Sequence, residues 1–152
     1  MTGYHLAQFN IGRAHVPLDD EAIAEFVRAL GPINELAELS PGFVWRLVDE
    51  SGQSSSYVEV PEIDDPLMLV NYSIWTDLES LRHFVHKSGH MSYLRRRGEW
   101  FEPATEATSV CWWIAEGEIP SVSEAYAALM ALRSDGPSQK GWPMNQALDP
   151  PG

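Results

Sequence analysis

The chain has 152 residues, 44% of them hydrophobic, which suits one globular domain that needs no disulfide or metal to hold its core. A formal net charge of −12 disfavours binding to nucleic acid or to an anionic membrane surface, and the single cysteine, Cys111, excludes an intrachain disulfide. The N-terminal residues lack the pattern of a signal peptide, and no apolar run approaches the roughly 18 residues of a membrane span, so we expect a cytoplasmic protein.

Alternating and helical hydrophobic patterns follow one another along the chain. Strands are predicted at residues 4–11, 43–48, 67–75 and 109–115, with a short edge segment at 57–60. Helices are predicted at residues 17–39 with a break or kink at 31–32, at 76–87, at about 90–100 and at about 121–134. Two helix starts carry a capping box, Thr76 with Glu79 and Ser121 with Glu124.

This order of elements predicts an α+β fold, with a ferredoxin-like antiparallel sheet and helices on one face. The second face of the sheet would carry large apolar side chains, so we expect a second copy of the chain to cover it, giving a homodimer. Residues 1–136 form the predicted domain. Residues 137–152 form an irregular tail, expected to contact the partner subunit through Trp142 and Met144.

The third predicted strand carries an unusual polar residue. Asn71, Ser73 and Trp75 share one strand face, and Asn71 interrupts an otherwise apolar segment. A buried amide needs hydrogen-bond partners, which a neighbouring loop or a bound molecule would supply. Asn71 and Trp75 are four residues apart, about 13 Å along a strand. This spacing favours a pocket for a flat aromatic ligand.

Three histidines, His83, His86 and His90, cluster in the sequence. His90 follows Gly89 at a predicted helix start, where it would move a proton, bind haem iron, or serve as a helix-cap or interface residue. Because Gly89 interrupts the helix between His86 and His90, we expect no metal site there.

Arginine and tryptophan side chains complete the candidate site. The run at residues 95–97 would bind an anionic group or pair with neighbouring acids and the partner chain. Arg97 is the one of the three expected to point toward His90, because the two share a helix face. Arg46 lies in the second strand beside Trp45, on the opposite face. Of the pair at residues 112 and 113, one ring should be core, and Trp113 is the candidate for the pocket.

Residues 73–84, followed by His90, resemble the antibiotic-biosynthesis monooxygenase superfamily, with a strand that ends in Trp, an acidic helix start and a later His. More closely, the chain resembles an uncharacterised bacterial family of the dimeric α+β barrel group. The segments that carry this resemblance are residues 6–11, 41–47, 70–75, 88–90, 95–101 and 112–113.

The resemblance implies a dimeric α+β barrel and a role for Asn71 and Trp75, because cofactor-free oxygenases of the superfamily contact an aromatic substrate with an Asn and a Trp at this spacing. The haem-degrading relatives add a His, but the spacing from Trp75 to His90 is longer here than theirs.

The predicted function is therefore that of an enzyme without a bound cofactor, acting on an aromatic or polyketide-like molecule by oxygenation, cyclisation or isomerisation. Asn71 would stabilise an enolate oxygen and His90 would move a proton. The predicted substrate-binding residues are Trp75, Trp45, Arg46, Arg97 and Trp113. The alternatives are a haem protein with His90 or His86 as axial ligand, and a non-catalytic dimer that binds a ligand.

Overall fold

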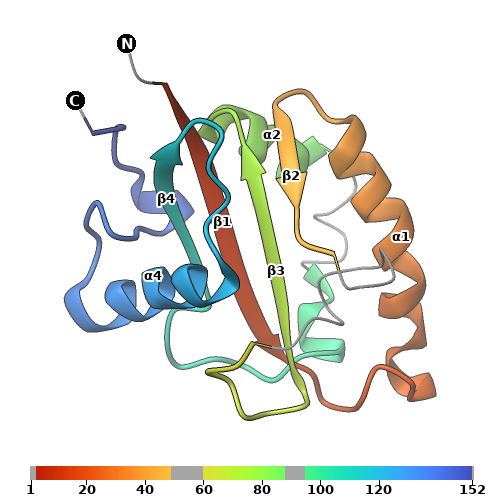
Figure 1. The fold of residues 1–152 in the computed structure, drawn as a ribbon. Helices are drawn as coiled ribbons and strands as arrows, with labels where there is room; N and C mark the ends of the chain where they lie inside the picture. Colours follow the sequence, from red (N-terminus) through yellow and green to blue (C-terminus); the bar gives the residue numbers. More distant parts are fainter. Residues whose placement is uncertain (1–2, 49–59, 88–94, 152) are drawn as a thin grey trace.

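The computed structural model describes residues 3–48, 60–87 and 95–151, and its centre is a four-stranded antiparallel sheet in the order β2-β3-β1-β4 (Figure 1). The strands are β1 (Tyr4–Arg13), β2 (Phe43–Arg46), β3 (Met68–Trp75) and β4 (Ser109–Ala115). The helices are η1 (Glu21–Ile23), α1 (Ala24–Leu39), α2 (Leu78–Lys87), η3 (Arg97–Glu99), α4 (Val122–Asp135) and η4 (Met144–Gln146). This order confirms the predicted ferredoxin-like α+β fold.

The central strand β1 pairs with β3 on one side and with β4 on the other. Leu6 lies opposite Trp75, and Asn10 lies opposite Asn71. Because side chains alternate along a strand, the even-numbered residues of β1 lie on one face with the odd-numbered residues of β3. We call this face, which α1 and α2 cover, the pocket face.

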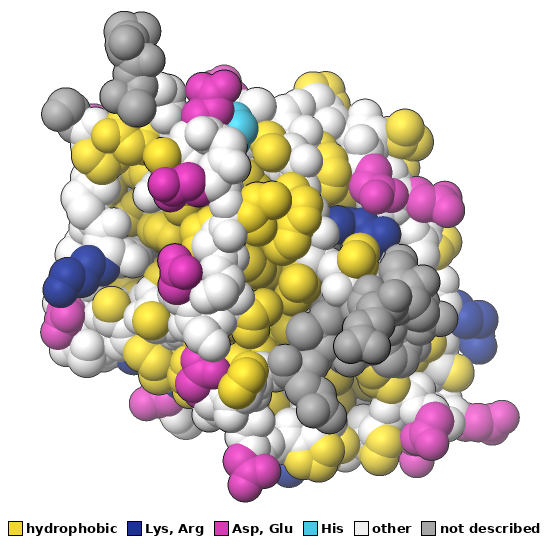
Figure 2. Space-filling view, viewed as in Figure 1, with side chains coloured by type: hydrophobic (Ala, Val, Ile, Leu, Met, Phe, Trp, Pro, Cys, Tyr) yellow, Lys and Arg dark blue, Asp and Glu magenta, His cyan; other side chains and the backbone are white. Residues whose placement is uncertain are grey.

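The other face of the sheet is partly covered by α4, which crosses it over β4 and β1 (Figure 1). Small residues of α4, Ala125 and Ala128, let it approach the strands closely, and Leu129 is fully buried there. The chain's own last helix therefore covers part of the face that we expected a second copy to cover. Hydrophobic side chains remain visible beside α4 (Figure 2), and the homodimer stays a prediction.

Strand β2 differs from its predicted pattern. The sequence suggests that Phe43 and Trp45 share a face, but the pairing of β2 with β3 shifts register between them. Phe43 therefore packs at Trp75 on the pocket face, whereas Trp45 packs on the other face against Tyr72, with ring centroids 5.1 Å apart. The same shift leaves Arg46 on the pocket face, opposite Ser73.

The helix starts and ends follow local hydrogen bonds. Asp20 caps η1, and the following α1 continues through Gly31 and Pro32 without a break. Ser121 caps α4 as predicted, accepting a hydrogen bond from the Glu124 N–H. The cap of α2 differs from the prediction.

At the start of α2, the Asp77 carboxylate rather than the Thr76 hydroxyl accepts the Ser80 N–H, at 2.7 Å. Asp77 directly precedes the first helical residue, Leu78, which is the N-cap position.

The C-terminal segment packs on its own chain. Trp142 is fully buried and forms two backbone hydrogen bonds with Cys111 of β4, of 2.7 and 2.9 Å. The Trp113 indole N–H donates to the Leu148 carbonyl oxygen at 2.8 Å. The expected contact of Trp142 with a partner subunit is therefore wrong, because the ring fills the chain's own core.

Residues 57–59 of the predicted edge segment and residues 90–94 of the predicted helix at about 90–100 lie outside the described residues. The described remainder of that predicted helix contains the short η3. Within the residues that the structure does describe, no helix is both long and apolar enough to cross a membrane.

Candidate functional site

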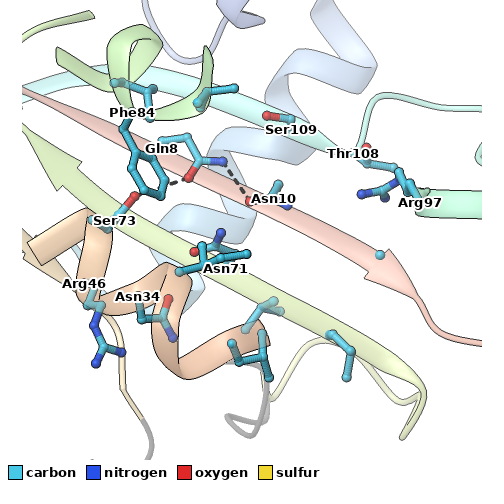
Figure 3. Close-up of a pocket in the computed structure, with 18 of the residues that line it drawn as sticks. Gln8, Asn10, Asn34, Arg46, Asn71, Ser73, Phe84, Arg97, Thr108 and Ser109 are labelled. Carbon is cyan, nitrogen blue, oxygen red and sulfur yellow. Dashed lines mark hydrogen bonds between the residues drawn. The ribbon is translucent and has the colours of Figure 1, made fainter. Parts of the chain in front are cut away.

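A cavity of about 290 Å³ lies between the pocket face of the sheet and the helices α1, α2 and η3 (Figure 3). Aromatic side chains line it at each end along the strands. Phe43, Trp75 and Phe84 form one end, and Phe26, Trp100 and Phe101 form the other. Concave, mainly apolar pockets with a few polar groups are typical of small-molecule sites.

The polar groups of the cavity gather in its middle. Asn10 on β1 and Asn71 on β3 are directly paired across the two strands, and both side chains line the cavity. One pair further along, Gln8 lies opposite Ser73. Figure 3 shows these four side chains on the two central strands, with Asn34 of α1 across the cavity from them.

A chain of hydrogen bonds fixes the orientation of one amide. The Trp75 indole N–H donates to Ser73 Oγ at 2.9 Å, and Ser73 Oγ donates to Gln8 Oε1 at 3.4 Å. Gln8 Nε2 then donates to Asn10 Oδ1 at 2.8 Å. The indole N–H can only donate, so Ser73 Oγ is its acceptor, and the Ser73 hydroxyl proton remains for the bond to Gln8. The Asn10 amide oxygen accepts the bond from Gln8 Nε2, and its NH₂ group has no hydrogen-bond partner in the described part of the chain.

Asn71 is the second available amide. Its side chain is exposed to the cavity and forms no hydrogen bond within the described part of the chain. The alternative that a neighbouring loop satisfies this amide does not hold for the described residues. Asn71 is exposed and not buried as the sequence suggested, so either water or a ligand atom can complete its hydrogen bonds.

Two arginines line the cavity, and they differ in their surroundings. Arg46 lies 3.4 Å from a Glu38 carboxylate oxygen. Arg97 is half-buried over the Phe101 ring, 5.1 Å from its centroid, and forms no ion pair with the described acidic residues. Burial lowers the pKa of Arg97 below its usual range, but a guanidinium remains charged at neutral pH.

The other arginines of the run lie outside the cavity. Arg96 pairs with Glu25 and Glu99 on the surface, which raises its pKa, and its guanidinium lies over the Trp100 ring. Arg95 is exposed. Of the three arginines, Arg97 alone lines the cavity, whereas its predicted orientation toward His90 stays a prediction because His90 lies outside the described residues.

The structure brings together four of the seven predicted site residues, Asn71, Trp75, Arg46 and Arg97. Trp45 does not line the cavity, because the register shift in β2 turns it to the other face. Trp113 shares the pocket face but packs against Trp142 of the C-terminal segment, with ring centroids 6.1 Å apart. His90 lies outside the described residues.

The sequence interpretation missed Gln8, Asn10 and Gly12, which the cavity also contacts. One sequence feature could have indicated them: after Leu6, every second residue of this strand is polar or small. Alternation alone did not identify them, because only the pairing with β3 places Asn10 opposite Asn71.

The chain belongs to the family described as Domain of unknown function (DUF3291), whose model matches residues 5–152. This confirms the resemblance to a family without an assigned activity. No curated protein matches the chain in sequence. Among solved structures, the chain is similar to the crystal structure of SnoaB, a cofactor-independent oxygenase from Streptomyces nogalater. The two share 15% identity with a TM-score of 0.44, over 78% of this chain and 96% of SnoaB.

Proposed function

We propose that this protein is an enzyme that binds a flat, mainly apolar molecule in the cavity and stabilises negative charge on one of its oxygen atoms. The substrate class is aromatic or polyketide-like, and the reaction is an oxygenation, cyclisation or isomerisation that needs no bound cofactor. One observation carries the proposal. Two amides, Asn10 and Asn71, are paired on adjacent strands and lie side by side in the middle of a cavity with aromatic ends.

Binding would rest on the aromatic ends of the cavity. Trp75 is almost fully buried, stacked on Phe84 with ring centroids 5.3 Å apart and in edge contact with Phe43 at 5.5 Å. These contacts hold the rings in place before a ligand arrives, so little ordering would be needed on binding. A flat ring packed at this end would extend toward the amides in the middle.

Charge stabilisation would come from the amide pair. The Asn10 NH₂ group is held by the bond that its oxygen accepts from Gln8, and Asn71 lies opposite. A donor fixed in advance near a developing enolate or phenolate lowers the barrier to forming it, and one such donor typically contributes 10²–10³-fold in rate. His90 is the proposed group that moves the proton.

A second candidate function, ligand binding without chemistry, is favoured by the composition of the cavity wall. None of its described lining residues is a His, Asp, Glu, Lys or Cys. The described wall therefore has no side chain that ordinarily exchanges a proton near neutral pH. In the haem alternative, His86 would be a ligand, but it is exposed on α2 and does not line this cavity.

We also propose that the protein acts as a homodimer in the cytoplasm. The support for a dimer is the incomplete cover of the sheet face beside α4, where partly buried apolar side chains such as Trp45 and Met130 pack at the edge of the core. Measuring the mass in solution by light scattering tests this, and a monomer at micromolar concentration would contradict it.

The amide pair is tested by Asn10→Ala and Asn71→Ala. Hydroxynaphthalenes and cyclic 1,3-diketones serve as probes, with oxygen uptake, product mass and deuterium uptake from solvent as readouts. Each readout reports one reaction class, and deuterium uptake reports an enolate directly. We expect each variant to lose about 10²–10³-fold in kcat at an unchanged melting temperature.

Asn145→Ala is the matched control, because Asn145 is exposed on η4 and does not line the cavity. Turnover that is the same in all four proteins would remove the amide pair from the mechanism. Tight binding of the probes with no chemical change in any readout would favour the non-catalytic function.

A further inference from the structure

We infer that the molecule bound in this cavity carries an oxyanion, a carboxylate or a phosphate group, at the end farthest from Trp75, where the Arg97 guanidinium binds it. This inference rests on the proposed function of the cavity and adds the class of substrate. It places three groups in order along the strands: the aromatic end, the amide pair and the arginine.

The first support is that Arg97 has no carboxylate partner among the described residues, although the protein is strongly acidic. The sequence has 22 Asp and Glu against 10 Lys and Arg, so partners for a cation are abundant. Arg13, Arg46, Arg96 and Arg133 each have a carboxylate partner. Arg97 is half-buried and has none among the described residues. A partly desolvated cation without a counter-charge is costly, and an anionic ligand would remove that cost.

The second support is the position of Gly12 beneath this arginine. A Cβ atom at residue 12 would lie 3.0 Å from Arg97 Nη2 and 2.9 Å from Phe101 Cδ1. Glycine therefore allows the guanidinium and the ring to lie directly against β1. The ring stacks on the guanidinium and helps to hold it at the cavity wall. The arginine is thus supported on two sides by the fold.

The third support is the spacing along the strand. Gly12 is two residues beyond Asn10, which is about 7 Å on the same face. The hydroxyl-bearing residues Thr108 and Ser109 line the cavity on this side, and Figure 3 shows Thr108 beside Arg97. The planar fork of a guanidinium matches the two oxygens of a carboxylate or phosphate. The expected substrate therefore carries its oxyanion about one ring width from the oxygen that the amides bind.

The test compares three probes of similar shape, 2-naphthoate, 2-naphthyl phosphate and neutral 2-naphthamide, by titration calorimetry on the full chain. We expect at least one anion to bind the wild-type protein ten-fold or more tightly than the amide. Arg97→Gln should abolish this preference, and Arg97→Lys should retain part of it. The tighter of the two anions identifies the oxyanion.

Arg95→Gln is the matched control, because it removes the same charge from the same run at an exposed position outside the cavity. It should leave the preference unchanged. Gly12→Ala keeps the charge but displaces Arg97, and it should weaken anion binding while amide binding persists. Circular dichroism melts of all variants show that they are folded.

Two results would overturn the inference while the pocket itself stands: wild-type protein that binds 2-naphthamide as tightly as both anions, or Arg97→Gln protein that keeps the preference. If none of these three probes binds, and none of the hydroxynaphthalenes used to test the amide pair binds either, the proposed function of the cavity fails together with the inference.

Discussion

The two faces of the sheet are built from the same strands but have opposite properties. On one face, Phe9 and Tyr72 are fully buried and pack edge to face beneath α4, with ring centroids 6.1 Å apart. On the other, their neighbours Asn10 and Asn71 border a cavity. Residues that are adjacent in a strand point to opposite faces of the sheet. The strands therefore supply a packed support and an open site at the same time.

This difference shows where the stability of the fold and its proposed chemistry reside. Packed side chains resist change, because the loss of buried atoms costs both transfer free energy and cavity formation. Side chains at a cavity have fewer neighbours, so their replacement costs little stability. A polar pair such as Asn10 and Asn71 is tolerated on the open face because water or a ligand can reach its amide groups.

The pocket face is itself divided. At β1 and β3 it is open, whereas around Cys111 of β4 it is closed by the C-terminal segment, which forms backbone bonds between Cys111 and Trp142. The four predictions below test these contrasts, in order of decreasing effect.

The largest effect is expected for the packed face. Phe9→Ala removes a fully buried ring and should lower the free energy of unfolding by about 3–5 kcal/mol. Asn71→Ala, on the open face, should change it by less than about 0.5 kcal/mol. Urea denaturation followed by tryptophan fluorescence measures both. Equal losses would contradict the division into a packed and an open face.

The pH dependence of stability tests whether Cys111, in the closed part of the pocket face, is buried from solvent. Burial raises the pKa of the Cys111 thiol to about 12, although the nearby Arg82 charge opposes this. In the unfolded chain the thiol ionises near its ordinary pKa of about 8.5. Above that pH the unfolded state loses this proton while the folded state keeps it, which favours unfolding. Stability should therefore fall as the pH rises, by up to about 1.4 kcal/mol per unit between about pH 9 and 12.

Cys111→Ala should remove this part of the alkaline loss. The difference in unfolding free energy between the wild type and Cys111→Ala should be constant from pH 6 to 8 and should shrink above pH 9. Burial also raises the pKa of Tyr72, but this contribution is common to both proteins and cancels in the comparison. A difference that stays constant to pH 11 would show that solvent reaches the thiol and that β4 is not closed.

A smaller effect is expected for the hydrogen-bond chain beneath the cavity. Ser73→Ala removes the acceptor of the buried Trp75 indole N–H and should cost about 1–3 kcal/mol in unfolding free energy. Ser123→Ala, which removes an exposed hydroxyl bonded to Glu62, should cost less than about 0.5 kcal/mol. Denaturation curves compare the two. If Ser73→Ala lowers the unfolding free energy no more than the control does, the hydrogen bonds from Trp75 through Ser73 do not stabilise this part of the fold.

The smallest effect is expected at the start of α2, whose Phe84 stacks on Trp75 at the edge of the cavity. Asp77→Ala should cost about 1 kcal/mol at pH 7, because the carboxylate caps the Ser80 N–H. That bond lowers the pKa of Asp77, so its contribution is present above the ordinary carboxyl range near pH 4 and is lost below it. Thr76→Ala should be nearly neutral. Thermal melts at pH 7 and pH 3 measure both, and a larger loss for Thr76→Ala would restore Thr76 as the cap.

Much of the fold could be predicted because it depends on local patterns. The four strands and the helix after Thr76 follow from hydrophobic period and capping residues. The same alternation placed Asn71 and Trp75 on one face. Each of these inferences uses residues close together in the sequence, where the geometry of one strand or helix sets which side chains share a face.

Tertiary structure alone decided the rest. The position of Asn10 opposite Asn71 depends on the register between β1 and β3, and the turn of Trp45 to the far face depends on a shift in the β2 pairing. The burial of Trp142 depends on contact with β4. These features arise from contacts between distant segments, which no local period encodes. The sequence by itself determined which side chains alternate on each strand, and the packing of the strands and helices determined which of them meet at the cavity.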